Sequence, residues 1–123
     1  MKLEQNERKI YLAGFFDGQG FVQYNFLKDS KGRTKFNVAF YQSGDREKID
    51  KMANIIRSLG IKVSIYEPKR KKGKKREHQI YITNRKDTEK FLRMILPHLI
   101  IKREQVETAL EKYDSYKRGL KND

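Results

Sequence analysis

The chain has 123 residues, a net charge of +13 at pH 7 and a pI of about 9.9. This charge predicts a polyanionic partner, with nucleic acid the first candidate and an anionic membrane surface the second. The sequence is 37% hydrophobic and 11% aromatic, which is enough for one folded domain and excludes a disordered chain. It contains no cysteine, which excludes disulfides, thiolate zinc sites and cysteine nucleophiles.

The sequence gives no sign of a membrane or secreted protein. No apolar run approaches the ~20 residues of a spanning helix, and the first residues, Met1 to Gln5, do not resemble a signal peptide. We expect an intracellular protein, cytoplasmic or organellar. The two histidines, His78 and His98, are too few and too isolated for a histidine-rich metal nuclease. We interpret His78 as a core or rim residue, and His98 as a packed surface residue rather than a general base.

The apolar periodicity predicts four helices and four strands in the order αββαββαα. Helices are expected at residues 5–18, 45–59, 87–96 and 101–116, and strands at 20–28, 35–41, 61–67 and 77–83. Asp45 is predicted to cap the second helix, and Asp87 or Thr88 the third. Gly60 is expected to follow the end of the second helix. Four antiparallel strands with helices on one face make an α+β domain.

The strand alternation leaves the other face of the predicted sheet polar. Its expected members are Gln23, Asn25, Lys35, Asn37, Tyr41, Lys62, Ser64, Tyr66, Gln79, Tyr81 and Thr83. Asparagine and glutamine can pair with adenine in the major groove, lysine can donate to guanine, and a β-ribbon fits that groove. A polar face is also how a sheet meets water, but the positive charge favours nucleic acid.

A basic run at residues 69–76, which includes Arg70, separates the last two predicted strands. Seven of its eight residues are lysine or arginine. We interpret the run as a loop that contacts phosphates, which would make binding strongly salt-dependent. A solvated loop and a localisation signal are the alternatives.

Residues 11–21, YLAGFFDGQGF, combine the end of an apolar helix, a glycine-rich turn and the start of a strand. Gly14 and Gly18 lie four residues apart on one helical face, so this face can approach a second helix, or its own symmetry mate, unusually closely. Asp17 falls at the C-terminal end of the helix, where the macrodipole disfavours an acid. We therefore interpret Asp17 as placed for function rather than for stability.

The segment LAGFFDGQG closely resembles the signature of the LAGLIDADG homing endonucleases. The resemblance extends to the αββαββα order and to the stretch PHLIIK before the last helix, and covers roughly residues 8–116. It implies an intron-encoded DNA endonuclease that works as a homodimer. The two signature helices would pack at the twofold axis through Leu12, Ala13, Gly14, Asp17 and Gly18.

In this family the two sheets form a DNA-binding saddle over the major groove of a long, nearly palindromic duplex. Both strands are cut with Mg²⁺ or another divalent cation. The resemblance places the metal contacts on Gln19 and on the carbonyl of Gly18, and gives Asp17 a mainly structural role.

Further catalytic positions follow from the same resemblance. Lys102 matches a basic residue near the scissile phosphate, and Lys48 lies where a second basic residue is often found. A glutamine that orders water falls on Gln42 if one gap is allowed, or on Gly44 without a gap.

Gln19 departs from the family, which has an acid at this position. A neutral amide does not balance divalent charge beside phosphates, so we predict weak, altered or absent cleavage. A cleavage-deficient DNA-binding repressor and an RNA-splicing maturase are the alternative functions.

Overall fold

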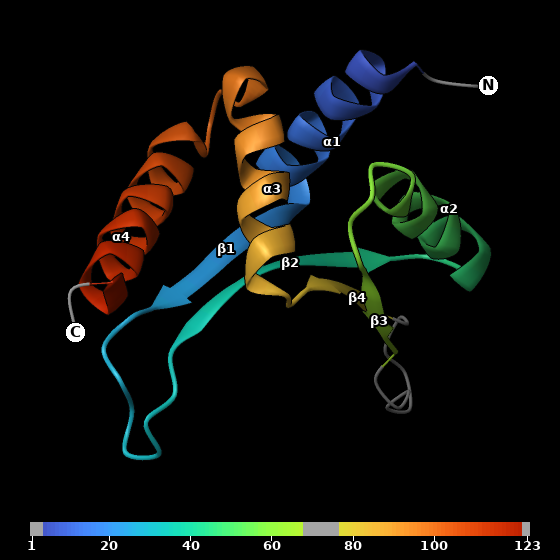
Figure 1. Ribbon diagram of the computed structural model, residues 1–123. Helices are drawn as coiled ribbons and strands as arrows, with labels where there is room; N and C mark the ends of the chain where they lie inside the picture. The colour runs from blue at the N-terminus through green and yellow to red at the C-terminus, as the bar shows by residue number, and fades with distance from the viewer. Residues whose placement is uncertain (1–3, 68–76, 122–123) are drawn as a thin grey trace.

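The computed structural model describes residues 4–67 and 77–121 as a four-stranded sheet with its helices on one side (Figure 1). Its elements are α1 (Gln5–Gln19), β1 (Gly20–Asn25), β2 (Lys35–Ser43), α2 (Arg46–Arg57), β3 (Ser64–Tyr66), β4 (Glu77–Ile82), α3 (Arg85–Ile95), the 3₁₀ helix η1 (Leu96–His98) and α4 (Arg103–Lys121). The predicted order and α+β class are confirmed. Within the described ranges, no helix is long and apolar enough to cross a membrane.

The sheet is antiparallel, with the strand order β1-β2-β4-β3. Alternate residues of the two central strands face the helices, and Val38, Phe40 and Ile80 among them are fully buried. Phe16 of α1 meets Phe40 edge to face at 6.0 Å and Phe91 of α3 at 6.4 Å. Each fully buried side chain of this size contributes roughly 1.5–3 kcal/mol. This core fixes α1 against the centre of the sheet.

Gly20 lets α1 continue directly into β1. A Cβ atom at this position would lie 2.6 Å from the Phe16 ring and 2.7 Å from the Phe40 ring. These rings belong to the core and cannot both move away, so only glycine fits. The close approach places the end of the signature at the start of the sheet.

Two predicted strands are shorter by more than one residue than the sequence pattern indicates. β1 ends at Asn25 rather than at residue 28, because the Asn25 side chain accepts a hydrogen bond from the Leu27 N–H at 3.0 Å and turns the chain. β3 covers only residues 64–66 of the expected 61–67. The Lys62 N–H donates to the Asp87 carboxylate at 3.1 Å instead of joining the sheet.

The helix caps agree with the sequence at α2 and differ at α3. Asp45 caps α2 as predicted, accepting from the Lys48 N–H at 2.9 Å. The prediction of Asp87 or Thr88 as the α3 cap was wrong, since the cap is Asn84, which accepts from the Asp87 N–H at 3.2 Å. The Thr88 hydroxyl is buried and donates to the carbonyl of Ile82. Apolar periodicity located α3 but not its first residue.

Asp17 joins the end of α1 to the start of α4. Its carboxylate accepts hydrogen bonds from the backbone N–H groups of Ile100 and Lys102, both at 2.9 Å. These groups precede α4, where orphan N–H donors and the helix dipole both favour an acid. The interpretation of Asp17 as ill-placed for stability was therefore wrong, because it serves the beginning of a second helix.

Lys102 connects the same two helices in the opposite direction, from the start of α4 to the end of α1. Its ammonium donates to the carbonyls of Phe16, at 3.3 Å, and Gly20, and it lies 5.7 Å from the Phe16 ring centroid. A cation at the start of α4 is disfavoured by that helix, but here the charge reaches the C-terminal end of α1, where it is favoured. We call this reciprocal contact of Asp17 and Lys102 the α1–α4 clasp.

The clasp lowers the pKa of Asp17. Partial burial acts to raise this pKa, but hydrogen bonds from the backbone N–H groups of Ile100, Lys102 and Ile101, together with the Lys102 charge, outweigh it. A carboxyl group with a lowered pKa in the folded state stabilises the fold above its unfolded pKa. That stabilisation is lost as the pH falls through the folded pKa.

We predict that Asp17→Asn lowers the free energy of unfolding by about 1–2 kcal/mol at pH 7, because one charged acceptor is lost. The difference from the wild type should shrink as the pH falls below the unfolded-state pKa of aspartate, about 3.9, and disappear once the folded carboxyl, whose pKa is lower, is protonated as well. Urea unfolding at one fixed protein concentration measures both. Asp50→Asn, which removes an exposed ion pair with Arg46, is the control and should cost less. An Asp17→Asn effect that is absent at pH 7 or independent of pH would contradict the clasp.

Candidate nucleic-acid interface and metal position

The open face of the sheet brings together nine of the eleven residues predicted for it. They are Gln23 and Asn25 of β1, Lys35, Asn37 and Tyr41 of β2, Gln79 and Tyr81 of β4, and Ser64 and Tyr66 of β3. Lys62 and Thr83 are exposed just beyond the ends of β3 and β4. The basic run with Arg70 lies outside the described residues.

Polar side chains on this face partly pair with each other. Asn37 Nδ2 donates to Gln23 Oε1 at 2.8 Å, across a directly opposed pair of β1 and β2. Asn37 is only 8% exposed, so its orientation is set by the sheet. Gln23 keeps the two donor hydrogens of its amide, which are the groups that a base edge in the major groove can accept.

Sequence reasoning missed Phe21 as a member of the open face. Phe21 lies opposite Ala39, and its ring stacks on Tyr41 with centroids 5.2 Å apart. The signal was present in the alternation with Gln23 and Asn25. Phe21 was predicted at the start of a strand but was not assigned to the polar face.

The long connection between β1 and β2 adds exposed cations that sequence reasoning had treated only as a turn. Figure 1 shows this connection extending past the sheet, on the side away from the helices. Lys28, Lys31 and Arg33 are all exposed here. Asp29 orders the turn by accepting from the N–H groups of Lys31 and Arg33 at 2.8 and 2.9 Å. The connection therefore presents positive charge beside the open face.

The predicted metal position is at the exposed end of α1, on Gln19 and Gly18. Both offer neutral oxygens, and the neighbouring Asp17 carboxylate is engaged by backbone N–H groups. Among the described residues, no three His, Cys, Asp or Glu side chains lie together in a way that could hold a metal ion. The residues of one chain therefore do not fit a divalent cation, which prefers charged oxygen ligands.

The other predicted catalytic residues lie in different surroundings. Lys102 is held at the end of α1 by the clasp, close to Gln19 in the fold. Phe40 is the residue of β2 that pairs with Gly20. Gln42 follows Phe40 by two residues, which places it about 7 Å farther along the strand. Its amide donates to the carbonyl of Ser43. Lys48 is exposed in the first turn of α2, 3.9 Å from Asp45. The structure thus joins Lys102 to the signature and leaves Gln42 and Lys48 with local contacts.

Gly14 and Gly18 form an open stripe on α1. A Cβ atom built on either glycine meets nothing within 4 Å. Ile10 and Tyr11, one turn earlier on the helix, are 54% and 49% exposed. Leu12 and Ala13, also predicted for the dimer interface, are fully buried in the chain's own core.

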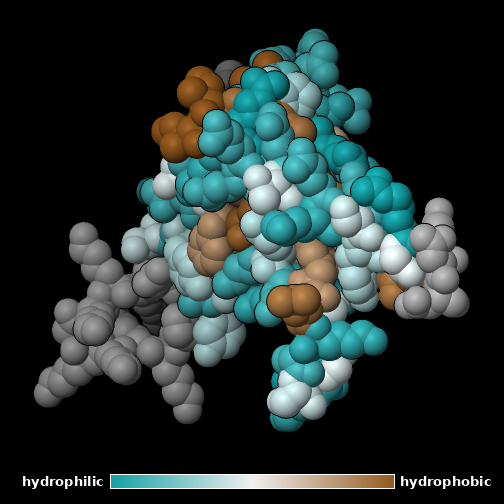
Figure 2. Space-filling view, turned by 90° about the vertical axis from the view of Figure 1, so that its left-hand side faces the viewer, coloured by the Kyte–Doolittle hydropathy of each residue, from teal (hydrophilic) through white to brown (hydrophobic). Residues whose placement is uncertain are grey.

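Exposed hydrophobic residues also gather near the clasp. Ile100 and Ile101 are 86% and 77% exposed, although their backbone is fixed by Asp17. Figure 2 shows hydrophobic side chains on the upper part of the molecule, where η1 leads into α4. A contiguous apolar surface of this kind commonly marks a contact with another macromolecule.

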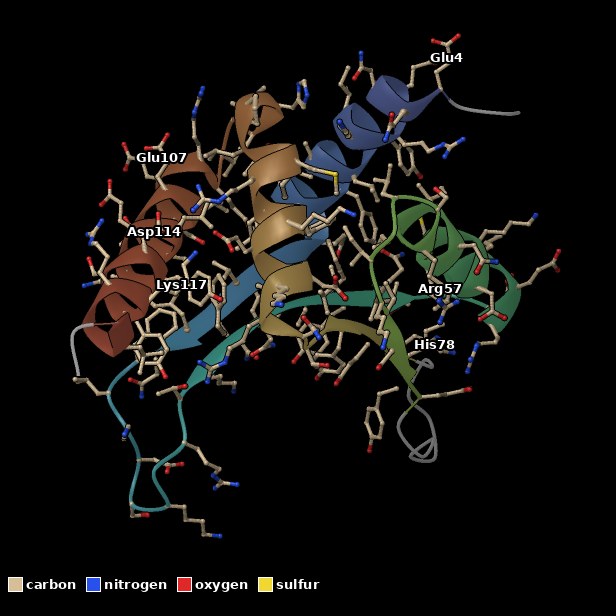
Figure 3. The ribbon with its side chains drawn as sticks, in the orientation of Figure 1. Glu4, Arg57, His78, Glu107, Asp114 and Lys117 are labelled. Carbon is tan, nitrogen blue, oxygen red and sulfur yellow. The ribbon has the colours of Figure 1, made fainter. Side chains whose placement is uncertain are left out.

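The two histidines have different environments. His78 is fully buried on the helix side of β4, with Nε2 3.4 Å from a Glu67 carboxylate oxygen (Figure 3). Glu67 also lies 3.6 Å from Arg46. The interpretation of His78 as a core residue is confirmed. His98 is exposed at the end of η1.

Solved structures of homing endonucleases share this fold, although the sequence identities are low. One is I-CeuI, a group I intron-encoded homing endonuclease complexed with DNA, with a TM-score of 0.67 and 18% identity over 100% of this chain and 61% of that chain. A second is I-CvuI in complex with its target in the presence of Ca, with a TM-score of 0.66 and 20% identity over 86% of this chain and 65% of that chain. A third is the archaeal intron-encoded I-Vdi141I complexed with DNA, with a TM-score of 0.65 and 23% identity over 94% of this chain and 72% of that chain. I-CvuI was also solved with the I-CreI target in the presence of Mg, with the DNA not cleaved.

One curated protein shares a shorter segment. Cobyric acid synthase of Clostridium acetobutylicum is 37% identical over 67 residues, which are 53% of this chain and 14% of that protein. The chain thus spans only a small part of this relative, and less than two thirds of I-CeuI and I-CvuI.

The family assignment depends on a longer match. A sequence model of the LAGLIDADG-like domain matches residues 6–96, which include the signature, all four strands and α3. The fold agrees with it, since α1 leads through Gly20 into the first strand of an αββαββα domain with an open sheet face. The chain belongs to the LAGLIDADG-like domain family.

Proposed function

We propose that two copies of this chain pair through α1 and bind one long, nearly palindromic DNA duplex with their open sheet faces. Cleavage of the duplex is limited by Gln19. The observation that carries this proposal is the polar sheet face, which begins where α1 ends and lies opposite all the helices (Figure 1).

The chemistry of the open face supports duplex DNA as the partner. Amide side chains from β1, β2 and β4 lie on one face of an antiparallel sheet, and a β-ribbon can enter a major groove. Lys28, Lys31 and Arg33 lie beside this surface, and the chain carries a net charge of +13. Phosphate contacts from such cations make affinity fall steeply with salt.

The open stripe of α1 supports pairing of two chains. Glycine within a helix costs up to about 1 kcal/mol relative to alanine, and none of the residues that the structure describes lies within 4 Å of a Cβ atom at Gly14 or Gly18. A second α1 packed on the same stripe uses the space above these glycines, because small residues allow close helix contact. The exposed Ile10 and Ile101 gain burial at the same time.

Pairing brings two copies of the α1 end, and therefore two Gln19 residues, to one place. A neutral amide there supplies no charge to hold divalent cations, and Lys102 contributes only positive charge. We propose Lys102 as the cation closest to the scissile phosphate. Binding is therefore expected to be strong, and cleavage weak, until an acid replaces Gln19.

Gly14→Leu is predicted to prevent self-association while leaving the single chain folded. A Cβ atom at this position meets nothing within 4 Å among the described residues, and the leucine side chain would block the approach of a second α1. Gly119→Leu is the matched control, since Gly119 is also an exposed helical glycine with nothing within 4 Å. Sedimentation velocity at low micromolar concentration should show dimers for the wild type and Gly119→Leu, and monomers for Gly14→Leu.

The same experiment can also reject the pairing. A wild type that stays monomeric, or a Gly14→Leu variant that associates as tightly as the wild type, would contradict it. In that case both leucine variants should simply melt at a higher temperature, because leucine favours the helix.

Gln19→Asp and Gln19→Glu are predicted to raise the cleavage rate of a bound palindromic duplex in Mg²⁺ by at least about tenfold, since even indirect metal partners have effects of that size. Gln5→Asp adds the same charge at the opposite end of α1 and should leave the rate unchanged. The substrate is selected by binding from a randomised duplex library. If the wild type and both acid variants bind but do not cut, the endonuclease function is wrong and the chain is a DNA-binding protein only.

A further inference from the structure

Three aromatic side chains form a patch on the open face at the end nearest α1. Phe21, Tyr41 and Tyr81 come from β1, β2 and β4 and surround Ala39, which pairs with Phe21 on one side and Tyr81 on the other. Phe21 and Tyr41 are stacked at 5.2 Å with their planes 14° apart. Ala39 has no exposed surface. We call these three residues the aromatic patch.

The hydroxyl groups of the patch are used within the sheet. The Tyr81 hydroxyl donates to Gln79 Oε1. Burial, and hydrogen bonding with the Tyr41 hydroxyl, raise the pKa of Tyr81, so this group stays neutral. The part of the patch that is left for a partner is ring carbon. An apolar surface within an otherwise polar face indicates a partner with an apolar group at that position.

The patch has a fixed place along the strands. Phe21 follows Gly20 directly, so the patch lies beside the end of α1 that carries Gln19. Two residues outward, Gln23 is opposed to Asn37. Two residues along a strand span about 7 Å, which is close to two base-pair steps of 3.4 Å. On the β1 side the face therefore changes from aromatic to amide within roughly two base pairs, whereas on β4 the amide Gln79 lies directly opposite Tyr41.

We propose that the aromatic patch contacts thymine C5-methyl groups, so that each half-site carries thymine at the innermost base pairs that the sheet reaches. The inference rests on the proposed DNA binding. In the major groove only thymine presents a methyl group, whereas cytosine and adenine present amino donors and guanine presents two acceptors. Aromatic ring carbons pack against a methyl group, but they form no hydrogen bonds with the polar groups of the other three bases, which would be left unpaired.

Replacing thymine by deoxyuridine tests this inference, because it removes the methyl group and keeps every hydrogen-bonding group of the base. The wild-type chain is used to select a duplex by binding, with Ca²⁺ in place of Mg²⁺. Each symmetric pair of thymines in that duplex is then replaced by deoxyuridine. At the pair that faces the patch we expect affinity to fall about fourfold per methyl group, or roughly fifteenfold for both half-sites.

Variants assign the effect to the patch. Phe21→Ala and Tyr41→Ala should bind the thymine and deoxyuridine duplexes equally at that pair. Asn25→Ala, which changes the outer part of the same face, should keep the difference. If either alanine variant fails to fold, the comparison of the thymine and deoxyuridine duplexes with the wild type still tests the thymine contact.

The outcomes separate this inference from the proposed function. Specific binding that no deoxyuridine pair weakens overturns the thymine contact alone. A loss that persists in both patch variants also overturns it. If the chain selects no duplex above non-specific binding, the proposed function fails and this inference fails with it.

Discussion

The α1–α4 clasp is the contact on which the rest of this structure depends. Asp17 holds the N–H groups that precede α4, and Lys102 holds the carbonyls that end α1. Each charge thus lies at the helix end that favours it, although each belongs to the other helix. The clasp anchors α1 without using its Gly14 face. It also fixes Gln19 beside the first residues of the sheet, which is where the proposed DNA contact begins.

The helix side of the sheet forms the core, and the open side is the proposed binding surface. Phe40 and Ile80, on the helix side of β2 and β4, are fully buried. The open side carries amide side chains from β1, β2 and β4 together with the rings of the aromatic patch. Because the core is complete within one chain, the open face and the open stripe of α1 are available for partners. A twofold assembly satisfies both at once, since one axis through α1 places two equivalent faces on one duplex.

Much of this architecture could be predicted from sequence, because it depends on local patterns. Alternation along the strands and the spacing of apolar residues gave the element order, and Asp45 was recognised as a cap. Boundaries set by distant groups could not be predicted. β3 is shortened where Lys62 bonds to Asp87, and α3 begins at the less conspicuous Asn84.

The site was predicted unevenly for the same reason. The role of Asp17 depends on Lys102, 85 residues away in sequence, so local rules alone made it look misplaced. Leu12 and Ala13 belong to the signature but face inward, which helical position alone could not reveal. Phe21 could have been predicted, because alternate residues of a strand face the same side of the sheet, as Phe21 and Gln23 do. The departure at Gln19 was visible in the sequence itself, and the structure adds that the described residues contain no group of three His, Cys, Asp or Glu side chains that could hold a metal ion.

The most direct test of the central claim is a disulfide across the proposed helix pair. The chain has no cysteine, so Gly14→Cys introduces a single thiol on the open stripe. Two such thiols on a twofold axis come within the 7 Å Cα separation that a disulfide needs. Under mild oxidation at low micromolar concentration, Gly14→Cys should form a covalent dimer that still binds the selected duplex, and Gly119→Cys should remain monomeric. Equal cross-linking of the two variants, or none at Gly14→Cys, would contradict the account.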